Sequence, residues 1–95
     1  MSFIIDPGCL HILRKLHNRK TYGAAHTPEE RVKGWAFHGL SGNPDALRAF
    51  EKCYKELVRD EIIIRGLKNK DMHIWLNSKK SDEIKKIITQ DVEGN

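Results

Sequence analysis

Hydrophobic positions recur at three- and four-residue spacing between residues 44 and 59, which places apolar side chains on one face of a helix. The members of this stripe are Leu47, Phe50, Cys53, Tyr54, Leu57 and Val58. Asn43 and Pro44 precede it and form a helix-start signal. The sequence therefore predicts an amphipathic helix over Pro44–Arg59 with one face in a core.

The pattern then changes to a period of two, which is typical of a strand. Apolar residues at 62–64 lead through Arg65 into the turn-rich segment 66–71. After that segment, Met72, Ile74 and Leu76 alternate with His73, Trp75 and Asn77. This predicts a β-hairpin whose tip carries Lys68 and Lys70. Trp75 falls on the side opposite the apolar residues of its strand. There it could stack on a base or a partner, but we expect partial burial against the first short strand.

A first helix is expected from Pro7 to about Asn18, because Asp6 can cap it and proline fits the first turn. Its candidates for burial are Leu10, Ile12, Leu13 and Leu16. Residues 3–5 are apolar and fit either a strand or a flap over the core. Residues 21–26 fit a short strand or a tight connection.

Thr27, Pro28 and Glu30 resemble a capping box with proline at the first helical position, so a second helix should begin there. Val32 and Trp35 supply its apolar contacts, and Gly34 suggests that it ends within two turns. Residues 37–43 are then expected to form a turn. A final helix, over about residues 78–90, would be capped by one of three polar residues and bury one apolar face. The caps are Asn77, Ser78 or Ser81, and the face is Ile84, Ile87 and Ile88.

The length of 95 residues predicts one α+β domain, with a core over about residues 7–77. A deep cleft between separate lobes is not expected, so an enzyme is a poor first hypothesis. Hydrophobic residues are 39% and charged residues 32% of the chain, which suits a folded protein. The sequence shows neither a membrane-spanning run nor the features of a signal peptide, so we expect a cytoplasmic protein.

The net charge of +4 is concentrated in one part of the chain. Between Arg65 and Lys86, seven basic residues stand against three acidic ones, which accounts for the whole excess. A second group of cations follows the predicted Pro44–Arg59 helix at spacings of four, three and four residues, on the face opposite the apolar stripe. We call this group the cation ridge: Arg48, Lys52, Lys55 and Arg59.

Residues suited to metal binding or catalysis show no useful spacing. The histidines are scattered over different predicted elements: His11, His17, His26, His38 and His73. Cys9 and Cys53 occupy apolar positions and are expected as reduced core residues. We find no glycine-rich phosphate loop and no nucleophile paired with a base by local spacing. The sequence therefore predicts no catalytic residue, no metal site and no cofactor.

Two helices joined by a turn and followed by a hairpin are the element order of a winged helix-turn-helix domain. From about Leu10 to Leu76 the chain resembles this superfamily, and residues 58–63 (VRDEII) resemble its passage from recognition helix into wing. Residues 22–27 (YGAAHT) are similar to a segment of small uncharacterised archaeal winged-helix proteins, with Ala24 where a second glycine would be expected. The resemblance implies a three-helix core, a wing sheet of two or three strands and a C-terminal helix.

In such a domain the third helix can enter the major groove of double-stranded DNA and the wing can reach phosphates. The candidate nucleic-acid-binding residues are the cation ridge together with Lys68 and Lys70 of the wing. A small transcription regulator, with a homodimer through the terminal helices, would fit this hypothesis. Two alternatives stay open: a solvated face of a soluble protein, and a protein-interaction subunit of a larger assembly whose last helix meets another polypeptide.

Overall fold

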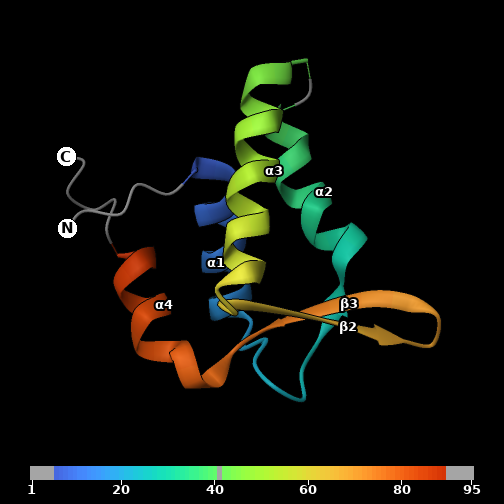
Figure 1. Ribbon diagram of the computed structural model, residues 1–95, viewed down its shortest axis with the longest axis vertical. Coiled ribbons are helices and arrows are strands. Elements are labelled where there is room, and N and C mark those ends of the chain that lie inside the picture. Colours follow the sequence, from blue (N-terminus) through green and yellow to red (C-terminus); the bar gives the residue numbers. More distant parts are fainter. Residues whose placement is uncertain (1–5, 41, 90–95) are drawn as a thin grey trace.

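The computed structural model describes residues 6–40 and 42–89, and the side chains of residues 37–40 lie outside that description. Over these residues the chain is α+β, with four α-helices and a three-stranded antiparallel sheet (Figure 1). The elements are α1 (Pro7–Asn18), β1 (Thr27–Pro28), α2 (Glu29–Leu40), α3 (Pro44–Arg59), β2 (Ile63–Lys68), β3 (Asp71–Leu76), a 3₁₀ turn η1 (Ser78–Lys80) and α4 (Ser81–Ile88). The expectations for residues 3–5 and 90–95 fall outside the described residues.

Helices α1 and α3 have the predicted bounds and the predicted caps. The Asp6 carboxylate accepts hydrogen bonds from the backbone amides of Gly8 and Cys9, at 2.8 and 3.2 Å. The Asn43 side chain accepts one from the amide of Ala46 at 3.1 Å. Each cap satisfies amide groups that have no partner inside the helix. Local sequence signals therefore suffice to position both helices.

A single core joins the helices to the inner face of the sheet. Helix α1 contributes the fully buried Cys9, Ile12, Leu13 and Leu16, and α3 crosses in front of it in Figure 1. The other fully buried side chains are Val32, Phe50, Ile63, Ile74, Leu76 and Ile84. Cys9 and Cys53 are free thiols in this core, as expected. Every described helix except the short η1 therefore contributes to one apolar interior.

The predicted hairpin is confirmed. Strands β2 and β3 pair from Ile63 opposite Leu76 to Lys68 opposite Asp71. Asn69 and Lys70 connect them with φ angles of 51° and 72°, the positive values that a tight two-residue hairpin turn requires. Strand β1 adds to the other edge of β3, which gives the order β1-β3-β2.

The predicted start of the second helix, at Pro28, is wrong by one residue. Thr27 and Pro28 form β1, which pairs with Ile74 and His73 of β3, and α2 begins at Glu29. Pairing with β3 holds these residues extended, and proline is tolerated because β1 is an edge strand. A distant strand has therefore overridden a local helix-start signal.

The predicted end of this helix is also wrong. Helix α2 continues past Gly34 to Leu40, so residues 37–40 are helical rather than part of a turn. Val32 and Ala36 of α2 are buried, and Trp35 packs against the core as a partly buried residue. Glycine in a helix interior costs about 1 kcal/mol of stability relative to alanine. Burial of these three apolar side chains can offset that cost, because tertiary packing supplies most of the stability of a helix in a protein.

Gly34 and Gly66 provide a matched pair of alanine substitutions. A Cβ at Gly34 would have no atom within 4 Å, so Gly34→Ala should raise the free energy of unfolding by up to about 1 kcal/mol. A Cβ at Gly66 would lie 2.6 Å from Cη2 of Trp75, so Gly66→Ala must displace that ring and should lower stability by about 1 kcal/mol. Urea denaturation of both variants checks this, and equal effects would contradict the contact with Trp75.

The last helix follows a turn that Asn77, one of the three proposed caps, stabilises. The Asn77 side chain accepts a hydrogen bond from the amide of Lys79 at 3.0 Å, and α4 then begins at Ser81. Ile84 is fully buried, and its two apolar companions Ile87 and Ile88 pack partly buried against the core. The apolar side of α4 therefore faces the domain's own core.

Candidate nucleic-acid interface

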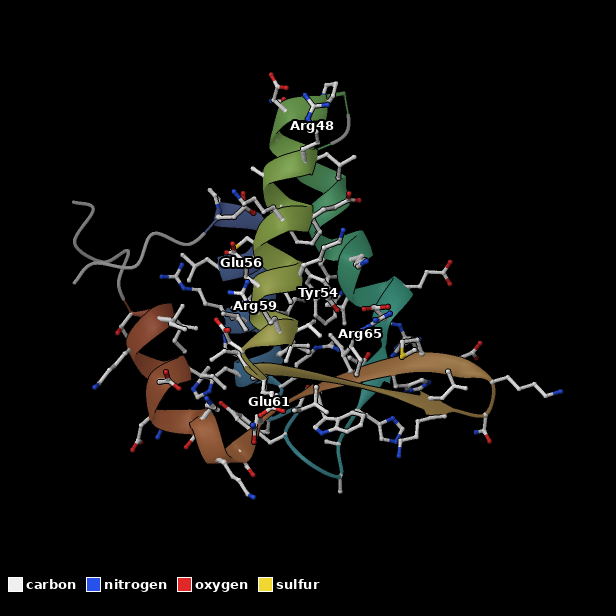
Figure 2. All side chains as sticks on the ribbon, viewed as in Figure 1. Arg48, Tyr54, Glu56, Arg59, Glu61 and Arg65 are labelled. Atoms are coloured by element: carbon white, nitrogen blue, oxygen red, sulfur yellow. The ribbon has the colours of Figure 1, made fainter. Side chains whose placement is uncertain are left out.

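The cation ridge lies on the solvent side of α3, and all four of its side chains are exposed. The opposite side of α3 holds the buried Phe50, Cys53, Tyr54 and Leu57. In Figure 2, Arg48 lies near the start of the helix and Arg59 near its end, so the ridge runs along most of the helix. One helix thus separates an apolar face from a cationic face, as its sequence pattern predicts.

The two arginines of the ridge have acidic neighbours. Arg48 pairs with Asp45 one turn earlier, and Nε of Arg59 lies 3.3 Å from the carboxylate of Asp60. Both arginine side chains are about 70% exposed, so these ion pairs contribute little stability, and either arginine can exchange its partner for another anion. The ends of the ridge are therefore partly neutralised in the free protein.

The centre of the ridge differs from its ends. Among the described residues, no carboxylate forms an ion pair with Lys52 or Lys55. Glu56, on the side of α3 away from Tyr54 in Figure 2, stands one helical turn after Lys52. Glu51 stands one turn before Lys55, but neither carboxylate pairs with either lysine. Lys52 and Lys55 are consequently the ridge residues best suited to hold a new anionic partner.

A basic hollow of about 270 Å³ joins α3 to α2 and to the base of the hairpin. Its lining residues are Glu29, Lys33, Tyr54, Lys55, Val58 and Arg65. Nζ of Lys33 lies 4.9 Å from the centre of the Tyr54 ring, a cation–π distance. Lys33 therefore extends the positive surface from α3 onto α2.

Lys33 is a residue that sequence reasoning missed. For this helix, the sequence predicted only the apolar contacts of Val32 and Trp35. Lys33 stands 22 positions before Lys55 in the chain. Helical spacing relates residues three or four apart, so no local pattern connects these two lysines. Only the packing of α2 beside α3 brings them to one hollow.

The floor of the basic hollow is a hydrogen-bonded group that we call the carboxylate network: Glu29, Tyr54 and Arg65. The Glu29 carboxylate accepts a hydrogen bond from the Tyr54 hydroxyl at 2.8 Å and two from the Arg65 guanidinium at 2.8 and 3.0 Å. Paired guanidinium–carboxylate bonds of this kind are strong and directional. The network ties the start of α2 to α3 and β2. Two of its members, Tyr54 on α3 and Arg65 on β2, are labelled in Figure 2.

The protonation of this network follows from its contacts. Burial acts to raise the pKa of the Glu29 carboxyl, but the hydrogen bonds from Arg65 and Tyr54 outweigh burial and hold that pKa below its ordinary value. Burial, reinforced by the charge of Glu29, raises the pKa of the Tyr54 hydroxyl. Glu29 is therefore a carboxylate at neutral pH, and it offsets the positive charge of Arg65.

The hairpin tip carries the two remaining candidate residues. Lys70 is exposed in the turn, and Lys68 is exposed with its Nζ 5.4 Å from the centre of the Trp75 ring. The hairpin extends sideways from the end of α3 in Figure 1, so these lysines stand apart from the ridge. The structure thus brings Lys55 to the base of the hairpin, while Lys68 and Lys70 form a separate positively charged surface at its tip.

Trp75 is half-buried on the outer side of the sheet. Its ring covers Gly66 of β2, and its centre lies 6.3 Å from that of the His26 ring. Partial burial is as expected, and the neighbours are Gly66 and His26, the last residue of the segment 21–26 for which a short strand was one expectation. Backbone beneath the ring and Lys68 beside it leave Trp75 poorly placed for stacking on a base.

Comparisons with known proteins do not assign a family. No protein-family model, no curated protein and no solved structure matches this chain. Within residues 6–40 and 42–89, no helix has the length and apolar character needed to cross a membrane. In the same residues, no group of three or more His, Cys, Asp or Glu side chains is placed to hold a metal ion. The winged-helix resemblance therefore stays a prediction.

Proposed function

We propose that this chain is a winged helix-turn-helix domain that binds double-stranded DNA through α3 and the β2–β3 hairpin. One observation carries the proposal: α3 fills the core with one face and presents a row of four exposed cations on the other. Short connections join α3 to α2 before it and to the hairpin after it. A recognition helix followed by a wing has this order.

The dimensions of α3 suit a groove. Sixteen residues at a rise of about 1.5 Å per residue give a helix about 24 Å long. The major groove of B-form DNA is about 12 Å wide and admits one α-helix. Helix α3 could therefore lie along the groove while the lysines of the basic hollow meet a phosphate strand beside it.

The cations divide into two proposed roles. Lys33, Lys52 and Lys55 would bind phosphates directly and release counterions from the duplex. Arg48 and Arg59 would first exchange their acidic neighbours for a phosphate or a guanine edge, which a guanidinium can contact with two hydrogen bonds. Lys68 and Lys70 would add phosphate contacts at the hairpin tip. The interface is then chiefly electrostatic.

A titration of the protein with a labelled random-sequence duplex tests the proposal. Five phosphate contacts, one for each lysine of the proposed interface, predict a slope of about −4.5 in log affinity against log salt, and hence about 500-fold weaker binding at 200 mM than at 50 mM salt. Fluorescence anisotropy at both concentrations measures this change. Absence of binding at 50 mM salt, or an affinity independent of salt, would contradict the proposal. Single-stranded DNA and duplex RNA of equal length serve as comparison ligands.

The protein-interaction alternative receives less support from the described residues. It depends on an apolar face of the last helix that the domain cannot cover itself. Ile84 is fully buried, and the backbone carbonyl of Ile88 accepts hydrogen bonds from the Arg14 guanidinium at 3.0 and 2.9 Å. These contacts attach α4 to α1 of its own chain.

A further inference from the structure

Two histidines meet on the outer side of the sheet, away from the proposed DNA-binding residues of α3. His26 precedes β1, and His73 lies in β3 opposite Pro28. Their Nδ1 atoms are 2.8 Å apart, with ring centres 4.7 Å apart and ring planes at 71°. Because β1 pairs with β3, two residues separated by 47 positions direct the same ring atom to one point.

The two Nδ1 atoms can share a single proton when both rings are neutral, one donating and the other accepting. They can instead place both lone pairs on a metal ion, since neutral imidazole is a common ligand of transition metals. We infer that His26 and His73 form a binding site for a divalent nickel or copper ion. This inference is independent of the proposed function.

The separation of the nitrogens is that of an N–H···N hydrogen bond, and it is also close to the value that one class of ion requires. Bonds of about 2.0–2.1 Å from a metal to two imidazole nitrogens 2.8 Å apart subtend an angle of about 84–89° at the metal. A tetrahedral zinc ion would need the nitrogens about 3.3 Å apart at the same bond lengths. Square-planar or tetragonal coordination uses angles near a right angle and is preferred by Cu²⁺ and Ni²⁺.

The surroundings of the pair complete the site. His26 is exposed and His73 half-buried, so water can occupy the remaining coordination positions. Asp71 stands two positions before His73 in β3 and therefore on the same side of the strand, where its carboxylate favours a cation. The Lys68 ammonium, which lies over the neighbouring Trp75 ring, disfavours a bound cation. We therefore expect a site of moderate affinity with open positions for a further ligand.

Nickel titration of the tag-free 95-residue chain tests the inference. Calorimetry should give one Ni²⁺ ion per chain, and Cu²⁺ should quench tryptophan fluorescence because Trp75 lies beside His26. His26→Ala and His73→Ala should each weaken Ni²⁺ binding at least about tenfold. His11→Ala, at an exposed position of α1, is the matched control and should leave the affinity unchanged.

Thermal unfolding gives a second readout that separates metal binding from folding. Ni²⁺ should raise the melting temperature of the parent and of His11→Ala, because an ion that binds only the folded state stabilises it. It should not raise that of His26→Ala or His73→Ala, whose far-UV circular dichroism without metal verifies folding. The inference is overturned if the parent shows no saturable Ni²⁺ binding, or if the two site variants bind as tightly as the parent.

Discussion

Reversing the charges of Lys52 and Lys55 together should weaken duplex binding at least about 30-fold, if each lysine contributes about 1 kcal/mol. These lysines occupy the centre of the cation ridge, and no described carboxylate forms an ion pair with either. Losing two phosphate contacts should also reduce the salt slope by about 2. Fluorescence anisotropy of the variant carrying Lys52→Glu and Lys55→Glu measures both quantities.

The matched control reverses two lysines on a different helix. Lys85→Glu with Lys86→Glu changes the net charge by the same amount, at exposed positions of α4. This control should lose less than about threefold in affinity if the contact is local. Equal losses in both double variants would mean that overall charge drives binding, and α3 would no longer be the interface. All four lysines are exposed. Reversal sets like charges one turn from Glu51 and Glu56 in α3, and it opposes the helix dipole in the last turn of α4. Each double variant should therefore lose about 1 kcal/mol of stability, and far-UV circular dichroism verifies that both are folded.

Replacing Glu29 with alanine should lower the free energy of unfolding by about 2–3 kcal/mol. Breaking a buried ion pair costs about 3–5 kcal/mol, but the Arg65 side chain is 43% exposed and water can solvate part of its charge. The Tyr54 hydroxyl, in contrast, is left buried without its acceptor. Urea denaturation followed by circular dichroism measures the change.

Tyr54→Phe is the matched control, because it removes the hydroxyl and keeps the ring and the Glu29–Arg65 pair. It should cost about 1 kcal/mol, the usual net value of one hydrogen bond. A cost equal to that of Glu29→Ala would show that the pair with Arg65 adds nothing to stability.

Acid should weaken the fold through the same carboxylate. The pKa of Glu29 is lower in the folded protein than its ordinary value of 4.5, so the folded state binds fewer protons than the unfolded state. The contribution of Glu29 is therefore complete above the ordinary value and is lost as the pH falls through the folded-state value. Glu29→Gln, which cannot titrate, should lose less stability than the parent between about pH 6 and pH 3. Identical acid profiles would remove Glu29 as a source of acid sensitivity.

The carboxylate network also bears on the proposed function. It fixes the base of β2 against α2 and α3, and so sets the direction in which the hairpin leaves the domain. Arg65 itself is occupied by Glu29 and is not counted among the proposed phosphate ligands. Arg65 was not among the candidate site residues predicted from the sequence, and Glu29 was assigned no role there.

Sequence alone determined α1, α3, the hairpin and the exposure of the cation ridge. Each depends on residues close together in the chain: the Asp6 and Asn43 caps, the apolar stripe of α3, and the two-residue turn at Asn69 and Lys70. Hydrogen bonds and helical periodicity act over about four residues, so these signals can be read directly.

Tertiary structure decided the rest, because the interacting groups are far apart in the chain. Pairing with β3 moved the start of α2 to Glu29, and packing of α2 against the core carried that helix past Gly34. The contacts of Glu29 with Arg65 and of His26 with His73 join residues 36 and 47 positions apart. No local pattern encodes such pairs, since they form only when the helices and the sheet close around one core.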